Sequence, residues 1–301
     1  MLDHSRLSFL THSDHIDRAA LLQRICVRPP YFALNNLHYS RGQFTATAVA
    51  EHPATSEVGP MQACEISRHA AICGLSAVAM NFGDDDRRYY LAQDATYQGY
   101  ANSAPYGSDV SFEARITDQN KRQATAEIIV TAGGQDLALL SVTYTILNEA
   151  SFKRLFRSKH SPFFTNFRQT EMPYLPSGEF VQTGRTCTVS VPRVPEEACA
   201  GHFEFYPALP VAMLMGQLGT IAGRMYARPY RVEAATMTAS DFCWAGESAQ
   251  FEVTALAENG SYACAALASG TVVSDMRLRL AAGVSDPLGQ AADLDLQVAT
   301  A

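Results

Sequence analysis

The sequence predicts an α+β protein made of two tandem copies of one module, each an antiparallel sheet packed on a long buried helix. Three paired features lead to this prediction: two β-meanders, two long apolar helices and two histidines, in the same relative places. The meanders begin at Phe112 and Phe251, 139 residues apart, whereas His52 and His202 lie 150 residues apart. An extra polar loop in the first copy, Gly83 to Arg88, accounts for the difference, as expected for a duplication.

Each meander consists of three predicted strands joined by short turns. The first reads FEARI, QATAEIIV and LALLSVTYTIL, and the second reads FEVTAL, YACAALA and VVSDMRLRL. Gly133-Gly134 and Asn259-Gly260 supply the positive φ that tight hairpins require, and the β-branched and aromatic residues favour strands. Antiparallel sheets are therefore expected in both copies.

The two helices are predicted from Met61 to Phe82 and from Val211 to Tyr226. Both stretches are rich in Ala, Leu and Met, and both are too long for strands. They are apolar around nearly the whole circumference, which indicates burial on all sides. A strand or two precede each helix and lead to the histidine of that copy.

The repeat divides the chain of 301 residues into two modules. The predicted boundaries are 1–150 for the N-terminal module, 151–178 for a polar linker and 179–282 for the C-terminal module. Residues 283–301 form a polar, turn-rich tail that is expected to be disordered.

Composition excludes several classes of protein. A net charge of -7, from 23 basic and 30 acidic residues, argues against nucleic-acid binding. Seven cysteines without a CxxC pair indicate a reducing compartment rather than a disulfide framework or zinc site. The N-terminus lacks an apolar signal core, and the longest apolar stretch, 208–223, is too short for a membrane span. We expect a cytoplasmic protein with no metal, cofactor, membrane or nucleic-acid partner.

One motif resembles a known family. Gly201-His202-Phe203, then Pro207, Leu209-Pro210 and the helix ending at Gly223, resembles the GHFP...P..PG...LE motif of bacterial 3-hydroxyacyl-carrier-protein dehydratases, which have the hotdog fold. LLQRICVRPPYFALNNL, Leu21 to Leu37, is similar to that family's N-terminal LLPHRYPFLLVDRV segment. In that family a curved sheet wraps around a long central helix, and two hotdogs make the active unit. The resemblance therefore implies a fused double hotdog, a pseudo-dimer within one chain.

The family pairs a His of one hotdog with an acid on the central helix of the other. The acid normally falls fourteen residues after the His, which here is Gly216, whereas the first helix retains Glu65, thirteen residues after His52. The resemblance thus implies His202 and Glu65 as the catalytic pair, and an inactive combination of His52 with Gly216. The first-half alignment needs a one-residue gap, so Ser67 is an alternative occupant of the acid position.

Further contacts with the thioester are implied around this pair. Val211 stands where the family has a Gly whose backbone N–H polarises the thioester carbonyl, and Phe203, Pro210 and His69 are expected beside the substrate. For His69, a purely structural role as a buried core histidine stays equally open. Glu204 replaces a proline of the motif. A neutral His suits removal of the α-proton, and a carboxyl group whose pKa is raised by burial suits proton donation to the departing hydroxyl.

The implied activity is dehydration of 3-hydroxyacyl thioesters, bound to an acyl carrier protein or CoA, in fatty-acid-like or polyketide biosynthesis. Two alternatives stay open. One is a hotdog thioesterase in which Glu65 activates water, and the other is a non-catalytic acyl-binding or partner subunit, since Gly216 and Val211 depart from the motif. Glu65 also has a structural interpretation, in which it pairs with Arg68 or His69 at i+3 or i+4.

A short basic segment stands out in this acidic chain. It contains Lys153, Arg154, Arg157 and Lys159 within seven positions. The segment is either a solvated linker or a docking surface that steers an acidic carrier protein. Association of two such pseudo-dimers into a homodimer is left open.

Overall fold

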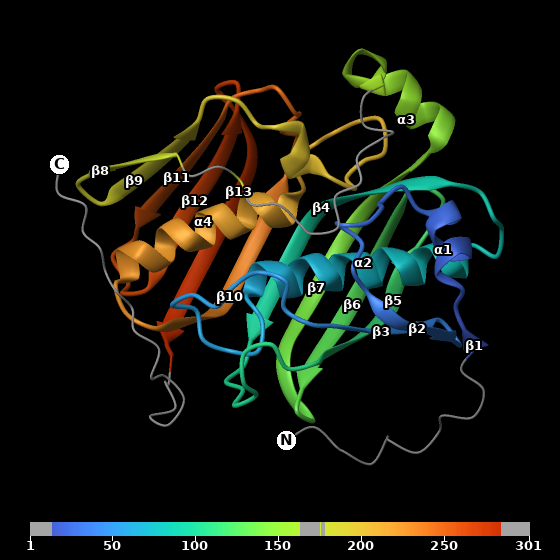
Figure 1. Cartoon of the computed structure of the whole chain (residues 1–301), viewed down its shortest axis with the longest axis horizontal. Coiled ribbons are helices and arrows are strands. Elements are labelled where there is room, and N and C mark those ends of the chain that lie inside the picture. The colour runs from blue at the N-terminus through green and yellow to red at the C-terminus, as the bar shows by residue number, and fades with distance from the viewer. Residues whose placement is uncertain (1–13, 163–174, 176–177, 284–301) are drawn as a thin grey trace.

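The computed structural model describes residues 14–162, 175 and 178–283 (Figure 1). The predicted tail lies outside these residues except for Gly283, as does much of the predicted linker. The strands of the first half are β1 Asp14–His15, β2 Asn35–Ser40, β3 Gln43–Ala48, β4 Arg88–Gly99, β5 Val110–Gln119, β6 Gln123–Ala132 and β7 Gln135–Asn148. Those of the second half are β8 Glu179–Thr183, β9 Thr186–Val191, β10 Tyr230–Ala239, β11 Ala249–Ala255, β12 Ser261–Ala268 and β13 Thr271–Ala282.

All of these strands belong to one antiparallel sheet. Its order is β1-β2-β3-β5-β6-β7-β4-β10-β13-β12-β11-β9-β8. The two halves of the sheet have the same strand order when each is followed from its outer edge to the middle. The order is β3-β5-β6-β7-β4 in the first half and β9-β11-β12-β13-β10 in the second. Both predicted meanders, β5–β7 and β11–β13, are confirmed, and the repeat is visible in the strand order.

The two halves join through a pair of strands that the repeat analysis did not identify. β4 and β10 are paired from Ala234 opposite Gln98 to Thr238 opposite Asp94, which makes the sheet continuous (Figure 1). A bulge in β4 lies between Ala92 and Asp94, so that Gln93 has no partner in the register with β7. Such bulges redirect a side chain out of the regular alternation.

The two predicted helices are confirmed as α2, Ala63–Asn81, and α4, Val211–Tyr226. Each lies against its own half of the sheet, and they meet where a Cβ on Gly216 would be 3.3 Å from Cys64 (Figure 1). α2 is buried on nearly all sides, as predicted. The prediction is wrong for part of α4, where Thr220 and Arg224 are exposed.

Two shorter helices, α1 over Arg18–Arg24 and α3 over Glu149–Leu155, were not predicted. α3 occupies the start of the predicted linker. It is held by aromatic packing, since the Phe152 ring stacks on Tyr89 of β4 at 3.5 Å and meets Phe203 at 5.5 Å. No helix in the described part of the chain is long and apolar enough to cross a membrane.

Candidate active site

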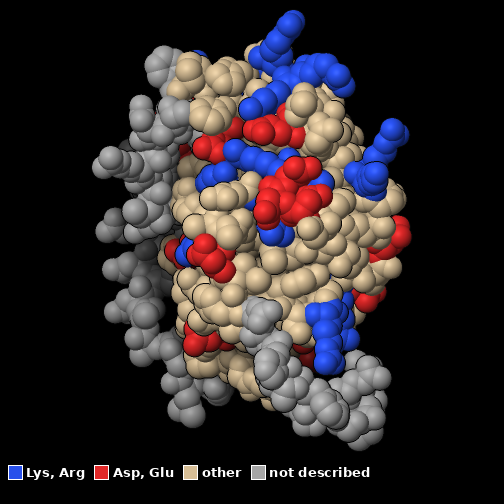
Figure 2. Space-filling model, turned by 90° about the vertical axis from the view of Figure 1, so that its right-hand side faces the viewer, with Lys and Arg blue, Asp and Glu red and all other residues tan. Residues whose placement is uncertain are grey.

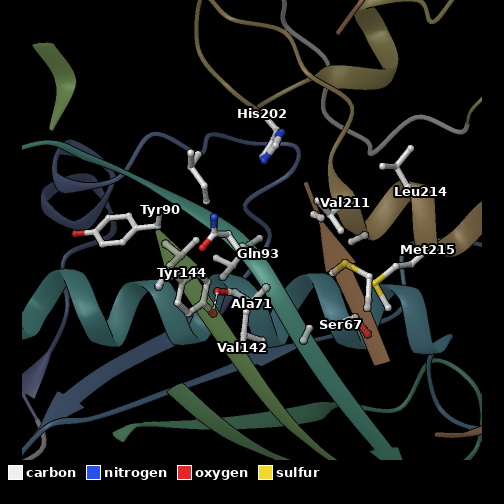
Figure 3. A pocket seen from close by; sticks show the side chains of 18 of the residues that line it. Ser67, Ala71, Tyr90, Gln93, Val142, Tyr144, His202, Val211, Leu214 and Met215 are labelled. Atoms are coloured by element: carbon white, nitrogen blue, oxygen red, sulfur yellow. Dashed lines mark hydrogen bonds between the residues drawn. The ribbon is translucent and has the colours of Figure 1, made fainter. Parts of the chain in front are cut away.

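An apolar cavity lies between the two halves, with His202 at one side (Figure 3). Together with the open solvent at its mouth, the space between its walls amounts to about 1200 Å³. The first half supplies α2, β4 and β7, and the second supplies β10, the start of α4 and the loop that carries His202. Its walls are mainly aliphatic and aromatic side chains, among them Ile72, Leu75, Tyr97, Leu214 and Met237. Such a space suits an extended hydrocarbon chain.

The imidazole of His202 has one nitrogen already occupied. Nδ1 lies 3.0 Å from the carbonyl oxygen of Ala208, which only accepts, so Nδ1 carries the hydrogen and donates it. In the neutral ring Nε2 is then the acceptor. Burial lowers the pKa of His202 to about 4, so the ring is neutral at neutral pH and Nε2 is a proton acceptor.

The loop that carries His202 fits closely against the first half. The Arg28 N–H donates to the Gly201 carbonyl at 2.9 Å, and the Tyr31 and His202 rings lie 4.9 Å apart. Gly201 has φ +77, and a Cβ there would lie 2.1 Å from the Arg28 carbonyl oxygen. Glycine is therefore required at this position for two reasons, the positive φ of the backbone and the close approach of the Arg28 carbonyl oxygen.

The amino end of α4 opens onto the same cavity. Val211 and Ala212 line it, and Pro210 at the N-cap makes no side-chain bond to the first turn. The first N–H groups of a helix have no partner within the helix, and the helix dipole places partial positive charge there. This end of α4 is thus suited to a carbonyl oxygen that develops negative charge.

From α2, the structure brings Ser67 into the cavity. Ser67, Ala71 and Leu75 follow one another at i+4 spacing and all line it. The Ser67 hydroxyl is buried and has no hydrogen-bond partner among the described residues, which leaves it for a ligand. Glu65 and Ser67 were the two candidates for the acid position. Of these two residues, Ser67 is the one that lines the same cavity as His202.

Glu65 lies elsewhere. It is not among the residues that line the cavity, and its Oε1 accepts hydrogen bonds from the backbone N–H groups of Glu51 at 3.1 Å and His52 at 2.7 Å. The same oxygen lies 3.3 Å from Nδ1 of His52. Burial raises the pKa of Glu65 to about 7. The structure therefore places Glu65 with His52 of its own half, rather than with His202 as the resemblance implied.

His69 belongs to the same polar group rather than to the cavity. Its Nε2 lies 3.0 Å from Nη2 of Arg68, and its ring packs at 5.7 Å from Phe112. Arg68 forms an ion pair with Glu51, not with Glu65. Burial, with the Arg68 charge second, holds the pKa of His69 well below its usual value. His69 is not among the residues that line the cavity, because its side chain is enclosed within the first half.

The remaining predicted residues divide between the cavity and the surface. Phe203 lines the cavity, whereas Pro210 is only the N-cap of α4. In the basic segment, Lys153 pairs with Glu149 at 2.9 Å and Lys159 with Glu247 at 2.6 Å. Arg154 and Arg157 are exposed. Basic side chains gather at the top of the molecule in Figure 2, at the height where Figure 1 shows α3.

Several polar residues of the cavity were not singled out from the sequence. Gln93, at the β4 bulge, extends on the side of the cavity that His202 occupies (Figure 3). Tyr90 has a buried hydroxyl without a hydrogen-bond partner in the described structure. Asp241 lies on the lining just after β10, and it is exposed. The sequence did contain one signal for Gln93, which is a polar residue within the strand-like run RYYLAQDATY. Its orientation toward the cavity depends on the bulge in β4.

Comparisons with solved structures identify the fold. An acyl-ACP thioesterase from Bacteroides thetaiotaomicron matches with a TM-score of 0.54 and 10% identity over 80% of this chain and 98% of its own. A protein described as an oleoyl thioesterase from Lactobacillus plantarum matches with a TM-score of 0.56, 10% identity, and coverage of 81% and 96%. The 12:0-ACP thioesterase from Umbellularia californica matches with a TM-score of 0.51, 11% identity, and coverage of 81% and 98%.

These matches span both halves of the chain and confirm the predicted double hotdog fold. No protein-family model and no curated protein sequence matches the chain.

Proposed function

We propose that this protein hydrolyses acyl thioesters carried by an acyl carrier protein or CoA. One observation carries the proposal: a neutral histidine and an uncapped helix amino end face the same apolar cavity. The acyl chain would occupy the cavity, with the thioester near His202 and Val211. The similarity in fold to proteins described as thioesterases supports this substrate class.

In the proposed reaction, Nε2 of His202 removes a proton from water as the water oxygen adds to the thioester carbonyl carbon. The N–H groups of Val211 and Ala212 stabilise the oxyanion of the tetrahedral intermediate. The intermediate then collapses, the carbon–sulfur bond breaks, and the thiolate takes the proton from His202. Gln93 and Ser67 supply polar contacts that orient the water and the thioester.

Hydrolysis requires fewer groups than dehydration. Dehydration needs a second group that protonates the departing hydroxyl, and Glu65, the expected acid, does not line the cavity. The carboxylate found on the described lining is Asp241, which is exposed and accepts a hydrogen bond from the N–H of Phe242 at 2.7 Å. Carboxyl groups that donate a proton near neutral pH are normally buried, and Asp241 is not.

Dehydration of 3-hydroxyacyl thioesters is the second candidate, and it is supported by the lining of the cavity, which includes His202 and Phe203 of the Gly201-His202-Phe203 motif. An intact-mass assay with a 3-hydroxyacyl carrier-protein thioester separates the candidates. Loss of the acyl group supports hydrolysis, and loss of water supports dehydration. If neither occurs with saturated or 3-hydroxylated acyl chains, both proposals fail and an acyl-binding role takes their place.

The role of His202 has its own test. We expect His202→Ala to lower kcat by at least about a hundredfold, since general-base catalysis contributes that order of magnitude. His52→Ala, the matched change in the other half, should leave kcat within about threefold, because His52 lies with Glu65 outside the cavity. Equal losses in both variants would contradict the assignment.

The pH dependence follows from the lowered pKa of His202. Protonated His202 cannot act as a base, so kcat/KM should fall only as the pH drops through about 4, well below the ordinary value near 6.5. A pH profile of the wild-type protein measures this, over the range in which circular dichroism shows the fold intact. An acid limb centred near 6.5 would contradict it.

A further inference from the structure

We infer that Glu204 is a positioning residue that fixes the His202 loop by an ion-pair clamp to two arginines of the first half. The clamp comprises Glu204, Arg28 and Arg87. Oε2 of Glu204 lies 2.6 Å from Nη2 of Arg87 and 3.2 Å from Nη2 of Arg28. The inference rests on the proposed function only in taking His202 as the base.

Both arginines are themselves held in place. Nη1 of Arg28 donates to the carbonyl oxygens of Leu22 at 2.5 Å, Ile25 at 2.8 Å and Val27 at 3.0 Å, at and beyond the end of α1. Nε of Arg87 lies 3.3 Å from the Cys26 sulfur. A carboxylate between two such anchored cations is restrained in position, because charge-assisted hydrogen bonds are directional and strong.

The clamp lies next to the cavity. Glu204 follows His202 by two residues, and Phe203 between them lines the cavity. Val27, beside Arg28, also lines it. A displacement of Glu204 therefore moves the backbone that carries the imidazole, and a shift of about 1 Å in a reacting group is enough to reduce turnover strongly.

The two halves hold their histidine loops differently. The His52 loop is held from within its own half, by the Glu65 carboxylate on α2. α4 contains no Asp or Glu, so it offers the His202 loop no such carboxylate. The carboxylate is instead in the loop itself, at Glu204, and the cations that bind it come from the other half.

The extra polar loop of the first half supplies one of these cations. The connection from α2 to β4 spans residues 82–87, whereas that from α4 to β10 spans only 227–229. Arg87 is the last residue of the longer connection, which ion pairs of Asp85 with Arg24 and of Asp84 with Arg88 hold in place. Acidic and basic side chains lie next to one another on the face of the molecule that Figure 2 shows. The extra loop carries Arg87, and Glu204 stands where the motif has a proline. The ion pair between these two residues thus gives both departures the same structural role.

The test compares Glu204→Gln with Glu233→Gln. Glu233 is a matched control, because it also lies near two arginines, Arg279 at 2.9 Å and Arg231 at 3.6 Å, and both glutamate side chains are 31% exposed. Glu204→Gln should lower kcat about tenfold and change KM less than about twofold, because the acyl chain contacts the apolar lining. Glu233→Gln should change neither. Arg87→Lys should retain more kcat than Arg87→Met, since the ammonium group still reaches an anion.

A second measurement is independent of turnover. The His202 ring resonance, identified by its loss in His202→Ala, should move in the NMR spectrum of Glu204→Gln and Arg87→Met and stay in place in Glu233→Gln. If the resonance is the same in all of these folded variants, the clamp does not position His202 and the inference is overturned. If the wild-type protein processes no thioester, the proposed function fails, and this NMR comparison still decides for or against the clamp.

Discussion

Glu65 and Ser67 differ by two residues on α2, yet they belong to different parts of the molecule. Each helical residue advances by about 100°, so two positions turn a side chain through about 200°. Ser67 therefore lines the cavity while Glu65 turns to the His52 loop. The sequence could present both as candidates, but a one-residue uncertainty in alignment was enough to exchange them. Helix rotation against the sheet decides between them, and packing sets that rotation.

The environment of Glu65 predicts how stability depends on pH. Its folded pKa is about 7, above the ordinary value of 4.5, so the folded state keeps a proton that the unfolded state releases. The unfolding free energy of the wild type should therefore fall relative to that of Glu65→Gln as pH rises from about 4.5 to about 7, by up to about 3 kcal/mol. Urea denaturation of both proteins across this range measures the difference, in which the contributions of groups that do not contact Glu65 cancel. A difference that stays constant with pH would contradict the raised pKa.

At the scale of elements, the long helices and meanders were predictable because each has a strong local signal. β4 and β10 were not, although they join the halves. Gln93 at the bulge interrupts the alternation of β4, and the pairing with β10 joins segments more than a hundred residues apart. Long-range pairing of this kind leaves no local pattern in a sequence. The contact between α2 and β7 in the first half shows how closely a helix fits against the assembled sheet.

That contact gives a prediction for Gly74 on α2. The Tyr144 hydroxyl of β7 donates to the Ala71 carbonyl at 2.8 Å, and a Cβ on Gly74 would lie 2.4 Å from this hydroxyl. Gly74→Ala should lower the unfolding free energy by about 1–3 kcal/mol through overpacking. Gly219→Ala on α4 is the control, because its added methyl group meets nothing within 4 Å and should be neutral or stabilising by up to about 1 kcal/mol. Thermal and urea unfolding compare the two, and equal effects would contradict the packing argument.

At the scale of the whole molecule, charge is unevenly distributed. The chain carries a net charge of -7, whereas the basic segment at α3 keeps Arg154 and Arg157 exposed. Lys153 and Lys159 are paired with acids, so the two arginines are the main candidates to meet an acidic carrier protein. We propose that this segment steers the carrier toward the cavity, since local charge accelerates encounter even on an acidic protein.

Charge reversal tests this docking surface. Arg154→Glu with Arg157→Glu should weaken binding of an acidic acyl carrier protein about tenfold at low salt, and the loss should shrink as salt is added. Lys121→Glu with Arg122→Glu, on the exposed turn between β5 and β6, changes the net charge equally and is the control. Surface plasmon resonance at two ionic strengths measures both double variants. Equal affinity of the two would remove the basic segment from the docking surface.

The join between β4 and β10 also explains why two such halves benefit from being one chain. Separated, each half would present one of these strands, of 12 and 10 residues, as a sheet edge with open backbone donors and acceptors. Long open edges are templates for aggregation. The covalent connection holds each edge against its partner at an effective concentration that is independent of how much protein the cell makes. Fusion thus keeps both strand edges covered by each other at any protein concentration.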